Sequence, residues 1–148
     1  MTLVQALTGE HLAAMLRENL PDVVESWNHR GVWVKPSAIA EVCGFLKVDE
    51  FLDFQYLNSI SAVDFIEFFE VVYHLTSISY QHTAMVKTRL YGRDDLVMPS
   101  VLHLWRGADF QEREIWDLMG IRFEGHPNMK RIMLWEGFDG HPLRKDFL

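Results

Sequence analysis

Three consecutive segments rich in aromatic and β-branched residues constrain the fold of this chain more than any other feature. They span residues 54–63, 68–76 and 83–91, and short polar stretches separate them. In the second and third segments the side chains alternate along the chain, as they do in strands that have one covered face. The pattern therefore predicts three neighbouring antiparallel strands.

Helical patterns before and after these strands complete the expected architecture. The elements predicted around the three strands are a helix that follows the N-cap Thr8 and ends before Pro21, short strands at 23–27 and 32–34, a helix starting near Pro36, and a helix at 108–119. This order favours an α+β fold: a two-layer sandwich with helices packed on a mostly antiparallel sheet, followed by an irregular C-terminal docking segment. We expect residues 1–107 to form the α+β part and 108–148 the last helix and docking segment, within one domain unit.

Charge and cysteine content exclude several classes of protein. The formal net charge of the 148-residue chain is -7, and residues 1–75 hold 4 Lys/Arg against 11 Asp/Glu. Nucleic acids and anionic lipids bind basic clusters, so we expect neither as a direct partner. Cys43 is the single cysteine. It cannot form an intrachain disulfide or supply the thiolates of an iron–sulfur cluster, and we expect it to fill the core of a cytoplasmic protein.

The helix predicted at 108–119 contains two residues on unexpected faces. Glu112 lies within its apolar arc, where a carboxylate without a partner would cost several kcal/mol. We therefore expect a basic partner, either Arg131 or Arg144. Phe110 lies on the charged face, as an apolar group at an interface does. The alternative is that Glu112 reaches solvent and Phe110 packs under a loop.

The same helical pattern places three charged residues opposite the apolar arc. Asp109, Arg113 and Asp117 follow one another at intervals of four residues. This spacing predicts a ladder of exposed ion pairs, each worth only a few tenths of a kcal/mol.

The last 24 residues combine turn formers with large apolar side chains. Gly125, Pro127, Gly137, Gly140 and Pro142 argue against a long helix there. A disordered tail would contain few residues such as methionine, tryptophan and phenylalanine, which this segment has. Long ordered segments without regular structure are usually functional, so we expect this one to wrap over its own domain, to dock on another protein, or to do both.

Two chemical alternatives have weaker support. Glu112, Glu114, Asp117, His126 and His141 could serve a small acid–base enzyme, but the first two lie about 160° apart on a helix and cannot act as a pair. A metal-binding module is the other alternative. None of the seven histidines forms a local pair at helical spacing, and His126 and His141 are expected to bond backbone carbonyls in turns. We therefore expect no catalytic, cofactor-binding or metal-binding residue in this chain.

Two motifs resemble the signatures of a known family. The first comprises residues 112–121 (EREIWDLMGI), Phe123, 125–127 (GHP) and 130–133 (KRIM), and the second comprises residues 140–147 (GHPLRKDF). Together they are similar to the hallmark regions of the C subunit family of NADH:quinone oxidoreductase, respiratory complex I. The N-terminal part matches the family in length and order of elements only. Many members have a longer C-terminal tail or are fused to a neighbour, so the end at Leu148 predicts a compact separate subunit.

The resemblance implies a non-catalytic scaffold in the peripheral arm of a complex that passes electrons from NADH or ferredoxin to quinone and translocates protons. Its partners would be the large hydrogenase-like subunit of the quinone site and neighbouring iron–sulfur subunits, which would hold the clusters and the quinone. It would lie on the cytoplasmic side of the cell membrane and contact the membrane only through the complex. The predicted interface residues are Phe110, Glu112, Arg113, Glu114, Asp117, Gly120, His126, Pro127, Arg131, Trp135, Phe138, Pro142, Leu143, Arg144, Lys145 and Asp146.

Overall fold

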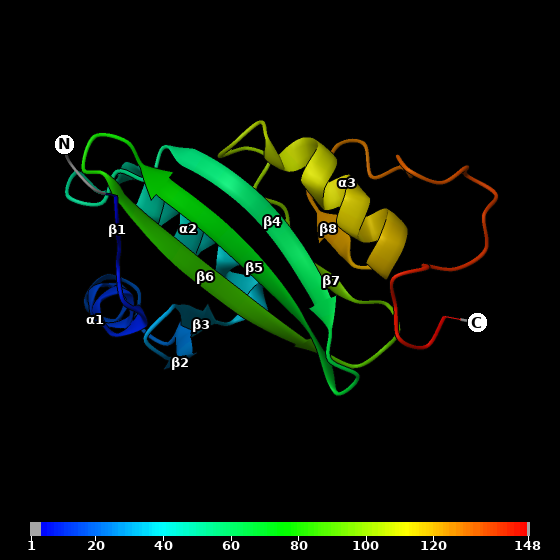
Figure 1. Ribbon diagram of the computed structural model, residues 1–148, viewed down its shortest axis with the longest axis horizontal. Coiled ribbons are helices and arrows are strands. Elements are labelled where there is room, and N and C mark those ends of the chain that lie inside the picture. Colours follow the sequence, from blue (N-terminus) through cyan, green and yellow to red (C-terminus); the bar gives the residue numbers. More distant parts are fainter. Residues whose placement is uncertain (1–3, 148) are drawn as a thin grey trace.

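The computed structural model describes residues 4–147 as an α+β fold, as predicted (Figure 1). The helices are α1 (Gly9–Asn19), α2 (Ile39–Val48), which follows a 3₁₀ turn at Pro36–Ala38, and α3 (Ala108–Met119). The strands are β1 (Gln5–Ala6), β2 (Val24–Trp27), β3 (Val32–Val34), β4 (Tyr56–Asp64), β5 (Phe68–Ser77), β6 (His82–Tyr91), β7 (Val97–Pro99) and β8 (Arg122–Glu124).

The main sheet has six strands and mixed pairing. Its order is β2-β3-β6-β5-β4, and β1 pairs with β6 beyond this path. The three long strands pair antiparallel, which confirms the prediction from their alternating side chains. Both β1 and β3 pair with β6 in parallel, which the sequence did not predict. Strands this short carry little periodicity, so the direction in which they pair depends on tertiary packing.

One face of the sheet packs against α2, which lies behind the strands in Figure 1. Val42, Cys43 and Leu46 of α2 are fully buried in the same apolar cluster as Tyr73 and Leu75 of β5. Cys43 is therefore a core residue, as expected, and burial raises the pKa of its thiol above the ordinary range. The opposite face of β4, β5 and β6 is crossed by no helix among the described residues (Figure 1).

Helix α3 covers the outer edge of β4 (Figure 1). The backbone N–H of Ile60 in β4 donates to Oε1 of Gln111 in α3 at 2.5 Å. An uncovered edge strand is a template for aggregation, and here a helix occupies that position. Strands β7 and β8, which the sequence did not predict, pair in parallel beside α3. They connect the sheet to the helix and to the segment that follows it.

Candidate docking site

Helix α3 carries two carboxylates that are fully enclosed, Glu112 and Asp117. Both are 0% exposed, so neither can contact a partner directly. They lie five residues apart and point to different neighbours. Glu112 bonds to the loop that precedes the helix, whereas Asp117 bonds to the segment that follows β8. Each carboxylate therefore fixes a different part of the chain to α3.

Glu112 is held by two donors from the loop after β7. Its Oε1 accepts from the Ser100 hydroxyl at 2.5 Å, and its Oε2 accepts from the Val101 backbone N–H at 2.9 Å. The expectation of a partner at Arg131 or Arg144 was therefore wrong. Burial raises the pKa of Glu112 by more than these two hydrogen bonds lower it. A hydroxyl and a backbone amide are therefore the partners of this enclosed carboxyl in place of the expected cation.

Asp117 is held by four donors from the C-terminal segment. Its Oδ2 accepts from the backbone N–H groups of Ile132, Met133 and Leu134 at 3.2, 2.7 and 2.9 Å, and its Oδ1 accepts from Arg131 at 2.9 Å. Burial alone would raise the pKa of Asp117, but these donors outweigh that effect and lower it. The carboxylate therefore remains charged inside the protein and orders a turn around itself.

The expected ladder of exposed ion pairs along α3 was also wrong. Asp117 is buried beneath the C-terminal segment, and the side chain of Asp109 lies 3.0 Å from Nε2 of His126. The guanidinium of Arg113 instead donates to the backbone carbonyls of Lys130 and Arg131. A helical wheel cannot show that an irregular segment later in the chain will cover the charged face.

Further bonds hold the segment against the C-terminal end of α3. Arg131 also donates to the Gly140 carbonyl at 2.8 Å, and the imidazole of His141 donates from Nδ1 to the Asp117 carbonyl at 2.9 Å. The predicted bond from His141 to a backbone carbonyl is thus confirmed. Gly120 ends the helix at φ 81°, and a Cβ there would lie 2.8 Å from the His141 ring. Only glycine fits both the left-handed backbone and this close approach.

The last described residues form a second anchor on the main sheet. Arg93 donates to both carboxylate oxygens of Asp64 at 2.7 and 2.6 Å, and it also contacts Asp146 at 3.0 Å. The backbone N–H of Lys145 donates to Asp64 at 2.7 Å, and Arg144 bonds to Asp146 and to the Arg93 carbonyl. The hydrogen bonds from Arg93 lower the pKa of Asp64. This network fixes the end of the segment to the end of β4.

His126 fixes the beginning of the segment. Its Nδ1 accepts from the Asn128 backbone N–H at 3.0 Å, so Nε2 carries the proton in the neutral ring. That nitrogen lies 3.3 Å from the Asp109 carbonyl and 3.0 Å from its carboxylate. His126 therefore bonds to a backbone carbonyl, as predicted, and its imidazole is fully buried.

The segment is ordered without burying its own apolar side chains. None of residues 125–147 falls in the fully buried class. Trp135 is 69% exposed, Leu143 is 60% exposed, and Phe110 on the neighbouring face of α3 is 62% exposed. These three residues, together with Ile132, Met133 and Phe147, define what we call the apolar docking surface. Phe110 is exposed as predicted, which rules out the alternative that it packs under a loop.

The predicted interface residues divide into three groups. Glu112 and Asp117 are enclosed and act by holding other residues in place. The exposed ones are Phe110, Glu114, Pro127, Trp135, Leu143, Lys145 and Asp146, and the half-buried ones are Arg113, Gly120, His126, Arg131, Phe138, Pro142 and Arg144. Sequence reasoning missed Asp64, Arg93 and Ser100, which anchor the segment and α3 from distant elements. No local pattern marks such residues.

The two chemical alternatives gain no support from this geometry. Glu112 and Asp117 are enclosed and bonded to protein donors, so a substrate cannot reach them. Among residues 4–147, no group of three or more His, Cys, Asp or Glu side chains is placed to hold a metal ion. Within the same range, no helix has the length and apolar character needed to span a bilayer.

The fold defines a class of protein: an α+β domain whose ordered C-terminal segment leaves large apolar side chains exposed. Comparison with known proteins identifies the family. The family model of the respiratory-chain NADH dehydrogenase 30 Kd subunit matches residues 32–148. The chain belongs to this family, which confirms the resemblance seen in the two motifs.

Curated relatives match almost the whole chain. The C 2 subunit of NADH-quinone oxidoreductase from Rhizobium meliloti (strain 1021) is 43% identical over 150 residues, which cover 95% of this chain and 81% of the relative. The C subunit of the same kind of enzyme from Roseiflexus castenholzii is 40% identical over 148 residues, with coverage of 95% and 84%. The chain is therefore similar in extent to bacterial proteins named as the C subunit.

A solved structure extends the similarity to another respiratory assembly. A chain of the membrane-bound sulfane sulfur reductase, an archaeal respiratory membrane complex, superposes with a TM-score of 0.71 at 31% identity. The match covers 94% of this chain and 85% of that one. The same fold thus occurs in respiratory complexes whose names specify different substrates.

Proposed function

We propose that this chain is a non-catalytic scaffold subunit of the peripheral arm of a complex I-like NADH (or ferredoxin):quinone oxidoreductase. It braces the large hydrogenase-like subunit that shapes the quinone site, so that the redox centres of the complex keep their geometry. Iron–sulfur clusters and quinone belong to its partners, and this chain holds no cofactor. The complex lies on the cytoplasmic side of the membrane, translocates protons, and provides the chain's only link to the bilayer.

The observation that carries this proposal is the way the C-terminal segment is ordered. Polar anchors at Asp117 and Asp64 hold the backbone in place, while the apolar side chains around Trp135 point away from the chain's own core. Large aromatic residues that are pre-positioned but unburied are typical of interface anchors. Because the backbone is already fixed, docking would cost little conformational entropy.

The family membership supports the choice of assembly. Relatives named as subunits of NADH-quinone oxidoreductase share the region that forms the docking surface, because their alignments cover about the whole chain. The electron donor and the kind of quinone are not determined by this subunit in the proposal. They depend on the other chains of the complex.

The proposal is tested by two substitutions at equally exposed aromatic residues. Trp135 in the docking surface and Phe51 before β4 are each 69% exposed. Trp135→Asp should leave the isolated chain folded but reduce its recovery in the membrane complex at least tenfold, because it places a charge in an apolar contact. Phe51→Asp should assemble normally. Recovery is measured by affinity purification of a tagged chain from its host and quantification of the hydrogenase-like and iron–sulfur subunits.

Two outcomes would overturn the proposal. Equal recovery of both variants would mean that the docking surface is not an interface. A purified wild-type chain that remains alone and turns over a substrate would favour the small-enzyme alternative.

A further inference from the structure

The uncovered face of the main sheet carries a stack of cationic and aromatic side chains. The indole of Trp33 from β3 reaches across β6 and donates from Nε1 to Glu70 on β5 at 2.8 Å. Lys87 and Arg89, two residues apart on β6, flank the indole at 4.6 and 4.5 Å from its ring centre. Arg89 also lies 5.3 Å from the ring of Phe68. Both cations are therefore held in place by aromatic rings.

These two cations have donors that the chain itself does not use. Glu70 is the cross-strand neighbour of Arg89, but its carboxylate accepts from Trp33 instead. Among residues 4–147, neither Lys87 nor Arg89 forms an ion pair or donates a side-chain hydrogen bond. The Nε of Arg89 is buried without an acceptor, and the residue as a whole is half-buried. A buried donor without an acceptor is costly, whereas the accessible donors of the two side chains are free to bind an incoming acceptor.

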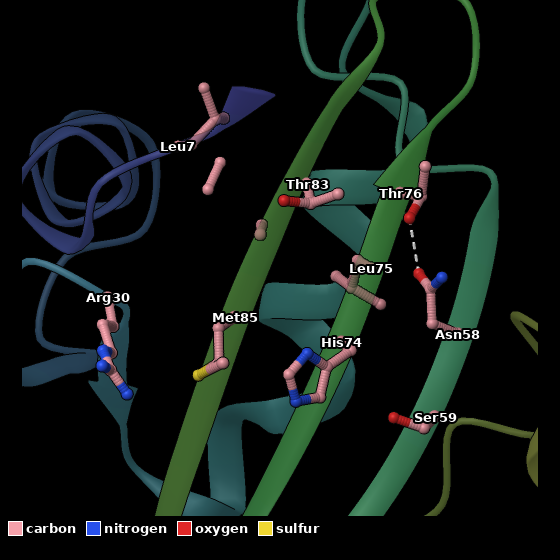
Figure 2. Close-up of a pocket in the computed structure, with 11 residues that line it drawn as sticks. Leu7, Arg30, Asn58, Ser59, His74, Leu75, Thr76, Thr83 and Met85 are labelled. Atoms are coloured by element: carbon pink, nitrogen blue, oxygen red, sulfur yellow. Dashed lines mark hydrogen bonds between the residues drawn. The ribbon is translucent and has the colours of Figure 1, made fainter. Parts of the chain in front are cut away.

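A hollow of about 300 Å³ continues this face toward the other end of the strands (Figure 2). Its rim includes Arg30, His74 and Met85, and Thr76 and Asn58 bond to each other there at 2.5 Å. Burial, and then the nearby Lys87, lower the pKa of His74, so this ring favours its neutral form. The hollow is lined by both polar and apolar side chains, is open to solvent and has no acidic side chain in its lining.

The charge of this face is opposite to that of the protein. The chain carries a net charge of -7. On the uncovered face of the three long strands, alternation places the cations Lys87 and Arg89 and one acid, Glu70, which is already bonded. A planar guanidinium fixed between two rings matches the two oxygens of a carboxylate.

We propose that this sheet face is a second docking surface, separate from the apolar one, and that it binds an acidic segment of a partner protein. Arg89 receives a carboxylate of that segment, Lys87 receives a second one, and the hollow beside His74 accepts the adjoining residues. Lys87, Arg89 and the rim residue Arg30 are too few cations for a nucleic-acid backbone or an anionic bilayer, which bind broad basic arrays. The proposal goes beyond the proposed function, because scaffolding through the apolar docking surface does not require this face.

Carbodiimide coupling of the purified native complex tests this proposal, since the reagent joins an amine to a carboxylate that it touches. The expected product links Lys87 to an Asp or Glu of another subunit, identified by mass spectrometry. Lys47 is the internal control, because its ammonium already donates to the Leu104 carbonyl at 2.5 Å and should remain unlinked. Arg89→Glu should lower the yield of the Lys87 link at least fivefold, whereas Arg89→Lys should lower it less.

The coupling outcomes separate this second docking surface from the scaffold role. If the chain co-purifies with its partner subunits but Lys87 forms no link, or links only to Glu70 of its own chain, the second docking surface is refuted and the scaffold role stands. A Lys87 that is unlinked and equally reactive toward acetylation in the free chain and in the complex would also refute it. Recovery of lipid or nucleic acid bound at this face would assign it to another kind of partner.

Discussion

Leu46 in α2 and Leu143 in the C-terminal segment are the same side chain in opposite environments. Leu46 is 0% exposed within a core formed by α2 and the main sheet, whereas Leu143 is 60% exposed on an irregular backbone. The first region is ordered because it buries apolar area, and the second is ordered because polar anchors hold it. Burial thus orders the first region and hydrogen bonds order the second, and under the proposed function the exposed apolar side chains of the segment contact another chain.

The largest expected effect on stability is the difference between alanine substitutions at these two leucines. Leu46→Ala should lower the free energy of unfolding by about 2–5 kcal/mol, because it removes buried methyl groups and leaves a cavity. Leu143→Ala should change it by no more than about 0.5 kcal/mol, as surface substitutions do. Chemical denaturation of both variants measures the contrast. Comparable losses would show that the segment is part of the core.

The next effect concerns the carboxyl that fixes the loop after β7. Glu112→Ala should cost about 3 kcal/mol, because it leaves the Ser100 hydroxyl and the Val101 N–H without acceptors and opens a cavity. Glu112→Gln is the matched control. A neutral amide of the same shape retains an acceptor, so it should cost about 1 kcal/mol or less. Thermal unfolding distinguishes the two, and equal losses would mean that the buried group needs its charge.

A smaller loss of stability is expected at the other carboxylate. Asp117→Asn should lower the free energy of unfolding by about 1–3 kcal/mol, because Arg131 and three backbone N–H groups lose a charged acceptor. Asp139→Asn, at an exposed position in the same segment, is the control and should leave the free energy of unfolding unchanged. Calorimetry gives the stability change. If the melting temperatures of both variants match the wild type, Asp117 does not hold the segment.

The two carboxylates should also respond to pH in opposite directions. The pKa of Glu112 is raised above its ordinary 4.5, so the stability contributed by its protonation is lost as pH rises through the raised pKa. The pKa of Asp117 is lowered below its ordinary 3.8, so its contribution is present above that value and is lost as pH falls. Unfolding curves between pH 3 and 8 for wild type, Glu112→Gln and Asp117→Asn would show the two slopes. Slopes of the same sign would contradict these assignments.

The sequence correctly predicted the elements whose side-chain pattern is contained in one continuous stretch of the chain. The three long strands, α1 with its Thr8 cap, and α3 were predicted correctly, because alternation and helical spacing are local patterns. The short β7 and β8 were missed, since three residues carry too little periodicity to be recognised. The parallel pairing of β3 with β6 depends on contacts between distant residues.

The surroundings of α3 were predicted correctly in part and wrongly in detail. The helical spacing correctly placed Glu112 on the buried, apolar side of the helix and Phe110 on its exposed side. It assigned Asp117 to an exposed ladder because it could not include the turn at 131–134, which closes over that carboxylate. The partners of Glu112 proved to be the Ser100 hydroxyl and the Val101 amide rather than a cation, because the loop after β7 lies against this face of the helix.

The central claim is that Asp117 orders the C-terminal segment in the isolated chain, before any partner binds. Hydrogen exchange of the backbone amides of Ile132, Met133 and Leu134, followed by NMR, tests it directly. These three amides should be protected in the wild-type chain and should exchange at unfolded rates in Asp117→Asn, while amides of β5 stay protected in both. Unfolded exchange rates at all three positions in the wild-type chain, with β5 still protected, would contradict it.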